Sequence, residues 1–187
     1  MSGEKRYPLT QAREVAESLV ILLAPACERT PVIAGSVRRE RPDVGDVELV
    51  VIPKPYDDEL WSHSPLDHVL ANPALFAPRP DKNGRITNGP MNKLLVHIPS
   101  GIPVDIFATT PEHFGMAMMV RTGSREWNIR FMARLKQLGF AGHAYPWNGK
   151  GKRHGSISTP NGELDCPDEL DVFRALGWAF MAPPGRV

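Results

Sequence analysis

Apolar residues recur at helical spacing in four parts of the chain. The first set, which would lie on one face of a helix, is Ala12, Val15, Ala16, Leu19 and Leu22. We expect this helix to run from Thr10, as its N-cap, to about Leu23, because Pro25 cannot continue it. The same spacing predicts a helix that opens at Pro111, one capped by Ser124 and ended by Gly139, and a last one from Pro167 to Leu176.

Short apolar or alternating runs between these helices predict β-strands. The clearest are Pro31–Ala34 and Val47–Ile52, followed by a hairpin made of Leu94–Ile98 and Ile102–Phe107. From Pro53 to Pro90 the chain holds seven prolines, so we expect little regular structure there. The glycine-rich stretch 149–162 is expected to form an exposed basic loop or hairpin.

Composition restricts the class of protein. With 187 residues, 42% hydrophobic and 23% charged, the chain suits a soluble globular protein of one or two lobes. Its longest apolar run, Leu19–Ala26, is far too short to cross a membrane, and we expect a cytoplasmic protein, most simply a monomer. Because Cys27 and Cys166 lack metal or redox spacing, we expect both to be reduced packing residues. The formal net charge of +1 excludes strong whole-surface attraction to DNA, so any DNA contact must come from local basic clusters.

Three acidic residues lie in strands that otherwise would be buried. Asp46 and Glu48 are two positions apart on one predicted strand, so their side chains point to the same face. Asp105 is a single acid in the apolar run Val104–Phe107. Carboxylates in such surroundings need charged partners, and three hard oxygen donors suit two Mg²⁺ or Mn²⁺ ions. The pattern therefore predicts a two-metal site for phosphoryl transfer.

A glycine turn precedes these acids. Gly35 and Ser36 follow a predicted strand and lead into Arg38 and Arg39, which would offer backbone N–H groups and positive charge to phosphates. Taken singly, a solvated edge strand or an ordinary turn explains each feature. The order of turn, arginines, paired acids and a later strand acid favours a nucleotide site.

With these motifs in place, the chain resembles the nucleotidyltransferase superfamily and, within it, the family X polymerases typified by DNA polymerase beta. The likeness covers Ala34–Ile52, Val104–Phe107, Arg121–Ser124, and the ending Leu176–Trp178 with Pro183, Pro184 and Arg186. It leaves out Lys54–Asn92. The resemblance implies that Asp46, Glu48 and Asp105 are catalytic metal ligands, with Asp105 nearest the primer 3′-hydroxyl.

The resemblance also implies nucleotide contacts. Gly35, Ser36, Arg39 and Gly45 would surround the β and γ phosphates. In the second lobe Gly123 would lie against the sugar, Asn128 would touch the base edge, and Arg121 would stand beside the nucleotide.

Three features depart from the family pattern. Glu48 stands where these polymerases have Asp, and Val120 and Arg121 replace an aromatic pair, which leaves the choice between deoxy- and ribonucleotides open. Because the first catalytic glycine is Gly35, we expect no N-terminal lyase domain and weak DNA affinity.

Basic residues of the second lobe are candidate DNA contacts. Arg125, Arg130 and Arg134 share the helix after the glycine turn, and Lys150, Lys152 and Arg153 lie in the glycine-rich stretch. Solvated charges on a helix or loop are an equal explanation. His63, Asp67 and His68 lack helical zinc spacing and are expected to be structural, and Trp127 and Trp178 are expected to be core residues.

These observations predict an α+β protein: a nucleotidyltransferase palm, a mixed sheet with helices on one face, over residues 1–110 with a proline-rich insert at 54–92. A small mainly helical thumb-like domain with a β-hairpin would occupy residues 111–187. The expected reaction adds a nucleotide from a dNTP to a primer 3′-hydroxyl with two metal ions, in short-gap filling during DNA repair on gapped or primer–template DNA. Two alternatives remain: transfer without a template or to a non-DNA acceptor, and a catalytically silent nucleic-acid-binding module.

Overall fold

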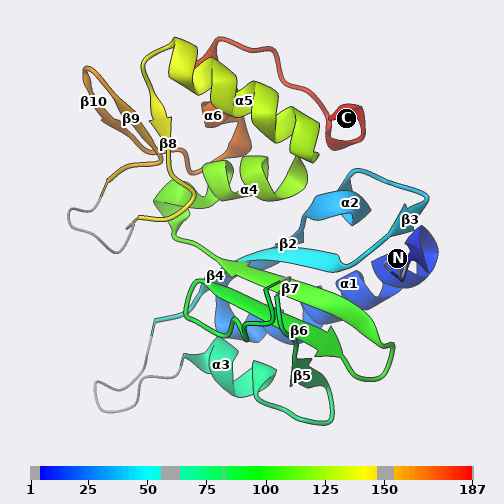
Figure 1. Ribbon diagram of the computed structural model, residues 1–187. Coiled ribbons are helices and arrows are strands. Elements are labelled where there is room, and N and C mark those ends of the chain that lie inside the picture. Colours follow the sequence, from blue (N-terminus) through cyan, green and yellow to red (C-terminus); the bar gives the residue numbers. More distant parts are fainter. Residues whose placement is uncertain (1–4, 56–63, 82, 147–153, 187) are drawn as a thin grey trace. The chain divides into compact units, whose positions relative to one another are not determined.

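The computed structural model describes residues 5–55, 64–81, 83–146 and 154–186. The chain divides into two compact units, Met1–Ala108 (unit 1) and Thr109–Val187 (unit 2). Figure 1 shows a sheet flanked by helices in unit 1 and mainly helices with a small sheet in unit 2. Among the described residues, no helix is both long enough and apolar enough to cross a membrane.

Unit 1 is built on a five-stranded mixed sheet with the order β2-β4-β7-β6-β5. Its strands are β2 (Cys27–Ile33), β4 (Val47–Pro53), β5 (Phe76–Pro78), β6 (Asn92–His97) and β7 (Ile102–Ala108). Only the central pair β4 and β7 runs parallel within this sheet. Its helices are α1 (Leu9–Leu23), α2 (Gly35–Arg38), α3 (Pro65–Leu70) and the 3-10 turn η1 (Ala24–Ala26), and β1 (Tyr7–Pro8) pairs with β3 (Asp43–Val44).

One face of the sheet carries the hydrophobic core of unit 1. Leu49 of β4 and Ile106 of β7 are register partners on this face, and both are almost fully buried. The helices α1 and α3 contribute Leu19 and Leu66 to the same cluster. Because strand side chains alternate, the residues between these positions point to the opposite face, which carries the acids.

The sequence predicted the long helix and the main strands of unit 1, but it missed several shorter elements. The first predicted helix, the predicted strand Val47–Ile52 and the predicted hairpin are confirmed by α1, β4 and the pair β6–β7. Thr10 is not the N-cap: Pro8 precedes the helix and makes no side-chain cap. The proline-rich stretch was expected to hold little regular structure, yet it contains α3 and β5. Ser64 and Asp67 form a capping box that starts α3 despite the surrounding prolines.

Unit 2 packs three helices against a three-stranded antiparallel sheet. The helices are α4 (Phe114–Thr122), α5 (Arg125–Gln137) and α6 (Glu169–Leu176), with 3-10 turns η2 (Pro111–His113) and η3 (Pro183–Gly185). The strands β8 (Ala141–Gly142), β9 (Ile157–Thr159) and β10 (Gly162–Leu164) have the order β10-β9-β8. Ser124 caps α5 as predicted, while α6 begins at Glu169, with Asp168 as its N-cap, rather than at Pro167. Trp127 is confirmed as a core residue, and Trp178 packs on it with ring centroids 5.6 Å apart.

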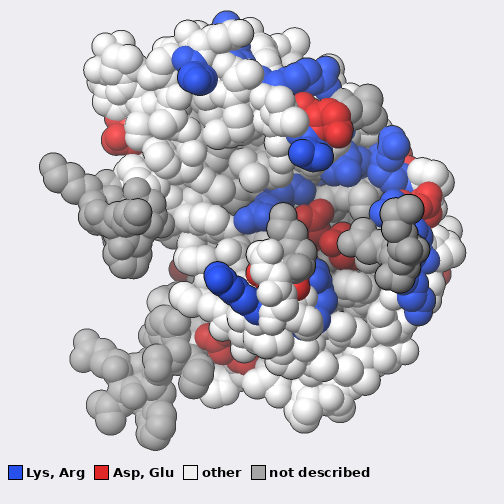
Figure 2. Space-filling model, in the orientation of Figure 1, with Lys and Arg blue, Asp and Glu red and all other residues white. Residues whose placement is uncertain are grey.

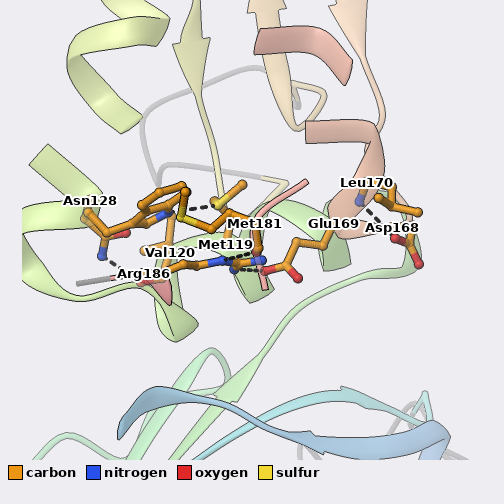
Figure 3. A network of polar contacts seen from close by, with 9 residues as sticks. Met119, Val120, Asn128, Asp168, Glu169, Leu170, Met181 and Arg186 are labelled. Carbon is orange, nitrogen blue, oxygen red and sulfur yellow. Dashed lines mark hydrogen bonds and ion pairs between the residues drawn. The ribbon is translucent and has the colours of Figure 1, made fainter. Parts of the chain in front are cut away.

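A buried arginine near the C-terminus ties unit 2 together (Figure 3). Arg186 is fully buried, and its guanidinium donates to Glu169 Oε1 at 2.5 Å and to the Met181 carbonyl at 2.9 Å. Aromatic rings surround it at 5.1 to 5.7 Å, from Phe173, Phe180 and Trp127. The last turn of the chain is therefore fixed to α6 by charge and by stacking.

Candidate active site

Register places two of the three predicted acids side by side on the open face of the sheet. Glu48 of β4 is the direct parallel partner of Asp105 of β7, so both side chains point to the same face. Asp105 is buried at 8% relative exposure, and Glu48 is half-buried. Figure 2 shows both acidic and basic side chains on the face of the molecule that it draws.

The same row crosses β4, β7 and β6 and reaches the residues that directly follow β2 and β5. On one side of the acids, the Ala34 amide donates to the Glu48 carbonyl at 2.8 Å. On the other side Asp105 pairs with Leu94, whose carbonyl accepts from the Arg79 amide at 3.0 Å. The acids therefore lie between the glycine turn that follows Ala34 and an arginine at the far edge of the sheet.

Arg79 was not predicted, and it forms an ion pair with Asp105 through Nη2 and Oδ1. Both side chains are largely shielded, with relative exposures of 24% for Arg79 and 12% for Asp105. From the sequence alone, metal ions were the expected partners of a buried acid. In this structure a guanidinium supplies that compensation.

Asp46 directly precedes β4, two residues before Glu48, and is half-buried. Over the described ranges, no group of three or more His, Cys, Asp or Glu side chains has the arrangement of a metal site. The role of Asp46 as a metal ligand therefore stays a prediction.

The glycine turn contacts the second acid directly. Gly35 begins α2 with φ +61°, a left-handed conformation that favours glycine. A Cβ at this position would lie 1.8 Å from Glu48 Oε2. The absence of a side chain at Gly35 thus makes the space that the Glu48 carboxylate fills.

The remaining predicted phosphate contacts of unit 1 surround this turn. Ser36 is half-buried in the first turn of α2, where backbone N–H groups have no partner within a helix. Arg39 is the half-buried C-cap of α2. Gly45 is half-buried, and a Cβ there would lie 3.5 Å from Arg6 Nη1. Arg6 in turn binds the Asp43 carboxylate at 2.8 Å, which fixes the segment before the acids.

The residues fit divalent metal ions in two respects. Glu48 and Asp105 present hard oxygen donors on neighbouring strands, and the space at Gly35 brings one of these donors to the turn that is predicted to contact phosphates. This donor chemistry suits Mg²⁺ or Mn²⁺ better than a softer metal.

In unit 2 the predicted nucleotide contacts gather at the junction of α4 and α5. A Cβ on Gly123 would lie 2.4 Å from Trp127 Cδ1 and 2.7 Å from Asn128 Oδ1. Asn128 Nδ2 donates to the Val120 carbonyl at 2.8 Å, and its buried Oδ1 has no hydrogen-bond partner among the described residues. Arg121 donates to the Tyr145 hydroxyl at 2.7 Å. This junction is closely packed, and Gly123 is needed for packing whether or not a sugar lies against it.

The predicted DNA contacts differ in their surroundings. Arg125 and Arg130 are exposed on α5, and Arg130 also lies over the Trp127 ring at 5.4 Å. Arg134 is half-buried and donates to the Leu176 carbonyl at 3.2 Å, a contact that holds α6. The predictions for Lys150, Lys152 and Arg153 lie outside the described residues.

Two sets of residues that were expected to be structural are described in part. Asp67 caps α3 and pairs with buried Lys93 at 2.5 Å, so it has a structural role, whereas His63 lies outside the described residues. Cys27 and Cys166 are buried free thiols, and burial raises the pKa of each to about 11.

The chain has a DNA polymerase beta-like fold, an α+β fold that holds a five-stranded mixed sheet in unit 1. The similar solved structures include Leishmania infantum polymerase beta in a ternary P/T complex, with a TM-score of 0.75 and 18% identity, over 98% of this chain and 77% of that one. The ternary gap complex of the same polymerase gives a TM-score of 0.74 and 18% identity, over 97% of this chain and 71% of that one. No protein-family model and no curated protein matches the sequence.

Proposed function

We propose that this protein is a nucleotidyltransferase that adds nucleotides from a dNTP to a primer 3′-hydroxyl, as in short-gap filling during DNA repair. The observation that carries the proposal is the register pair Glu48 and Asp105 with the Gly35 turn against Glu48. The polymerase beta-like fold supports it, since the similar structures are ternary polymerase complexes.

In this proposal each acid has a defined task. Asp46, Glu48 and Asp105 would hold two divalent ions, which when bound would offset the negative charge of the triphosphate and lower the pKa of the attacking hydroxyl. Glu48 would fix its ion beside the phosphates, because its carboxylate fills the space at Gly35. Asp105 would lie on the primer side, where the 3′-hydroxyl must approach in line.

The chain's own polar groups would position the triphosphate. Backbone N–H groups at the start of α2, with Ser36, would contact phosphate oxygens, and Arg39 would add positive charge. The buried Oδ1 of Asn128 is an acceptor suited to a base or sugar donor. Exposed Arg125 and Arg130 would contact the phosphates of DNA, without reading sequence.

One assay tests the proposal directly. The protein is incubated with a one-nucleotide gapped duplex and each nucleoside triphosphate, with Mg²⁺ and separately with Mn²⁺, and both primer extension and pyrophosphate are measured. We expect extension of the gap in the wild type and none in Asp46→Ala or Asp105→Asn. If the folded wild type shows no extension and releases no pyrophosphate with either metal, the proposal is excluded.

A second candidate is transfer that does not depend on a template or on deoxyribose. The observation that favours it is Arg121, which donates to Tyr145 at the start of the junction where the family has an aromatic pair. Extension of a single-stranded primer, or equal use of ribonucleotides on the gapped duplex, would select this candidate over gap filling.

A further inference from the structure

An arginine occupies the third carboxylate of the candidate site. Arg79 follows β5, two strands away from Asp105, and its amide bonds to Leu94, which is the register partner of Asp105. Its side chain therefore reaches across β6 on the face that carries the acids, and Nη2 binds Asp105 Oδ1. The Arg79 guanidinium thus brings a positive charge to the site.

The contact leaves Arg79 incompletely satisfied. Its Nε is buried and has no hydrogen-bond partner among the described residues. The buried cation on the other face of the sheet differs: Lys93 binds both Asp67 at 2.5 Å and the Gly89 carbonyl at 3.3 Å. Lys93 has the contacts of a structural residue, whereas the side-chain contact of Arg79 is made to an acid of the site.

We propose that Arg79 is the counter-cation of this site, so that a divalent ion must compete with its guanidinium for Asp105. This inference rests on one part of the proposed function, namely that Asp105 binds a divalent ion. Two positive groups within a few ångströms repel each other strongly where water is largely excluded, and they also share one acceptor. A bare ion therefore binds weakly, while an ion that arrives on a triphosphate carries negative charge that offsets Arg79.

Metal binding without nucleotide tests this inference. Free Mn²⁺ is measured by electron paramagnetic resonance while the ion is titrated into wild type, Arg79→Gln, Arg79→Lys and Arg85→Gln. We expect Arg79→Gln to bind Mn²⁺ at least about tenfold more tightly, because one nearby positive charge is removed. Arg79→Lys keeps that charge and should stay close to wild type. Arg85 is an exposed arginine of the same segment, so Arg85→Gln should change nothing.

The gain must also depend on Asp105. In an Asp105→Asn background, replacing Arg79 by Gln should no longer tighten Mn²⁺ binding, which a double-mutant cycle measures. Unchanged or weaker binding by folded Arg79→Gln would overturn the inference, and weaker binding would make Arg79 a residue that orients Asp105 for the metal.

A measurement on the wild type covers the case in which Arg79→Gln does not fold. Nitrogen-15 spectra follow the Arg79 side-chain N–H signals as Mg²⁺ is added, and we expect them to move as Asp105 is released. Signals that stay unmoved while the metal binds would overturn the inference. The proposed function is tested separately: absence of nucleotidyl transfer in a wild type that shows this competition would remove the function and leave the inference intact.

Discussion

Replacing Glu169 by Ala should strongly destabilise unit 2, because it leaves Arg186 buried without its acid. Arg186 has no exposed surface and the Glu169 side chain is 7% exposed, so water cannot solvate the guanidinium that remains. The Met181 carbonyl would be its remaining hydrogen-bond partner within the contacts of Figure 3. The stacked rings would lessen this loss but cannot replace a negative charge.

The size of the effect follows from this burial. Removing one partner of a buried ion pair costs about 3–5 kcal/mol, and a pair with almost no exposure needs no reduction for solvent screening. For a unit of the size of Thr109–Val187, each kcal/mol lowers Tm by about 4–8 °C. Glu169→Ala should therefore lower the melting temperature of unit 2 by at least about 12 °C.

Urea unfolding followed by tryptophan fluorescence measures this loss, since Trp127 and Trp178 both lie in unit 2. Arg174→Ala is the matched control on the same helix: it breaks the Asp171–Arg174 pair at 3.0 Å, whose arginine side chain is 75% exposed. That control should cost under about 1 kcal/mol. The double variant Glu169→Leu/Arg186→Met, which removes both charges, should recover much of the loss. A Glu169→Ala cost no larger than that of Arg174→Ala would refute the reasoning.

Three further predictions concern the glycine cradle, the thiols and the histidines. Gly35→Ala should abolish nucleotidyl transfer, because the added Cβ displaces the Glu48 carboxylate. The control Gly101→Ala has the same positive φ, but its Cβ meets no atom within 4 Å. Both variants should lose about 1–2 kcal/mol of stability in urea unfolding, and only Gly101→Ala should stay active. Cys27 and Cys166, with pKa values of about 11, should not react with a disulfide reagent at pH 8 until urea unfolds the chain; rapid labelling of the folded protein would contradict their burial. Burial lowers the pKa of His113 and of His143 from the ordinary 6.5, and for His143 the stacked ring of His154 at 3.7 Å lowers it further. The unfolded chain then takes up protons first as pH falls, so stability is full above pH 6.5 and declines below it. Melting curves of the wild type, His143→Leu and His68→Leu are recorded at a series of pH values. His143→Leu should weaken the decline of the melting temperature below pH 6.5, whereas His68→Leu, at an exposed position, should not. An equal decline in all three proteins would contradict this prediction.

The acids of the site could be predicted because their signal is local. Asp105 in an apolar run and Glu48 in a β-branched strand each break the expected pattern, and strand alternation assigns each a face. Strand alternation does not predict the register between two strands. This register depends on how β4 and β7 pair, although more than fifty residues separate Glu48 and Asp105 in the chain. The resemblance to a family supplied that expectation, and the parallel pairing of Glu48 with Asp105 confirms that the two acids are neighbours.

Arg79 could not have been found in this way. It lies in a stretch where prolines favoured irregular structure, and the three-residue strand β5 has no alternation long enough to recognise. Its position beside Asp105 comes from two successive antiparallel pairings, β5 with β6 and β6 with β7. Each pairing is set by tertiary packing, such as the burial of Phe76 and Leu95 on the core face, rather than by local propensity.

The buried acid and its arginine change what can be inferred from an acid in a strand. An isolated carboxylate in an apolar run must be compensated, and the sequence alone suggested that metal ions do this. Because Arg79 compensates Asp105, the burial of this acid does not by itself require a bound ion. Burial and the proposed metal binding therefore make different demands on Asp105: the first is met by a cation from the chain itself, and the second would require that cation to give way.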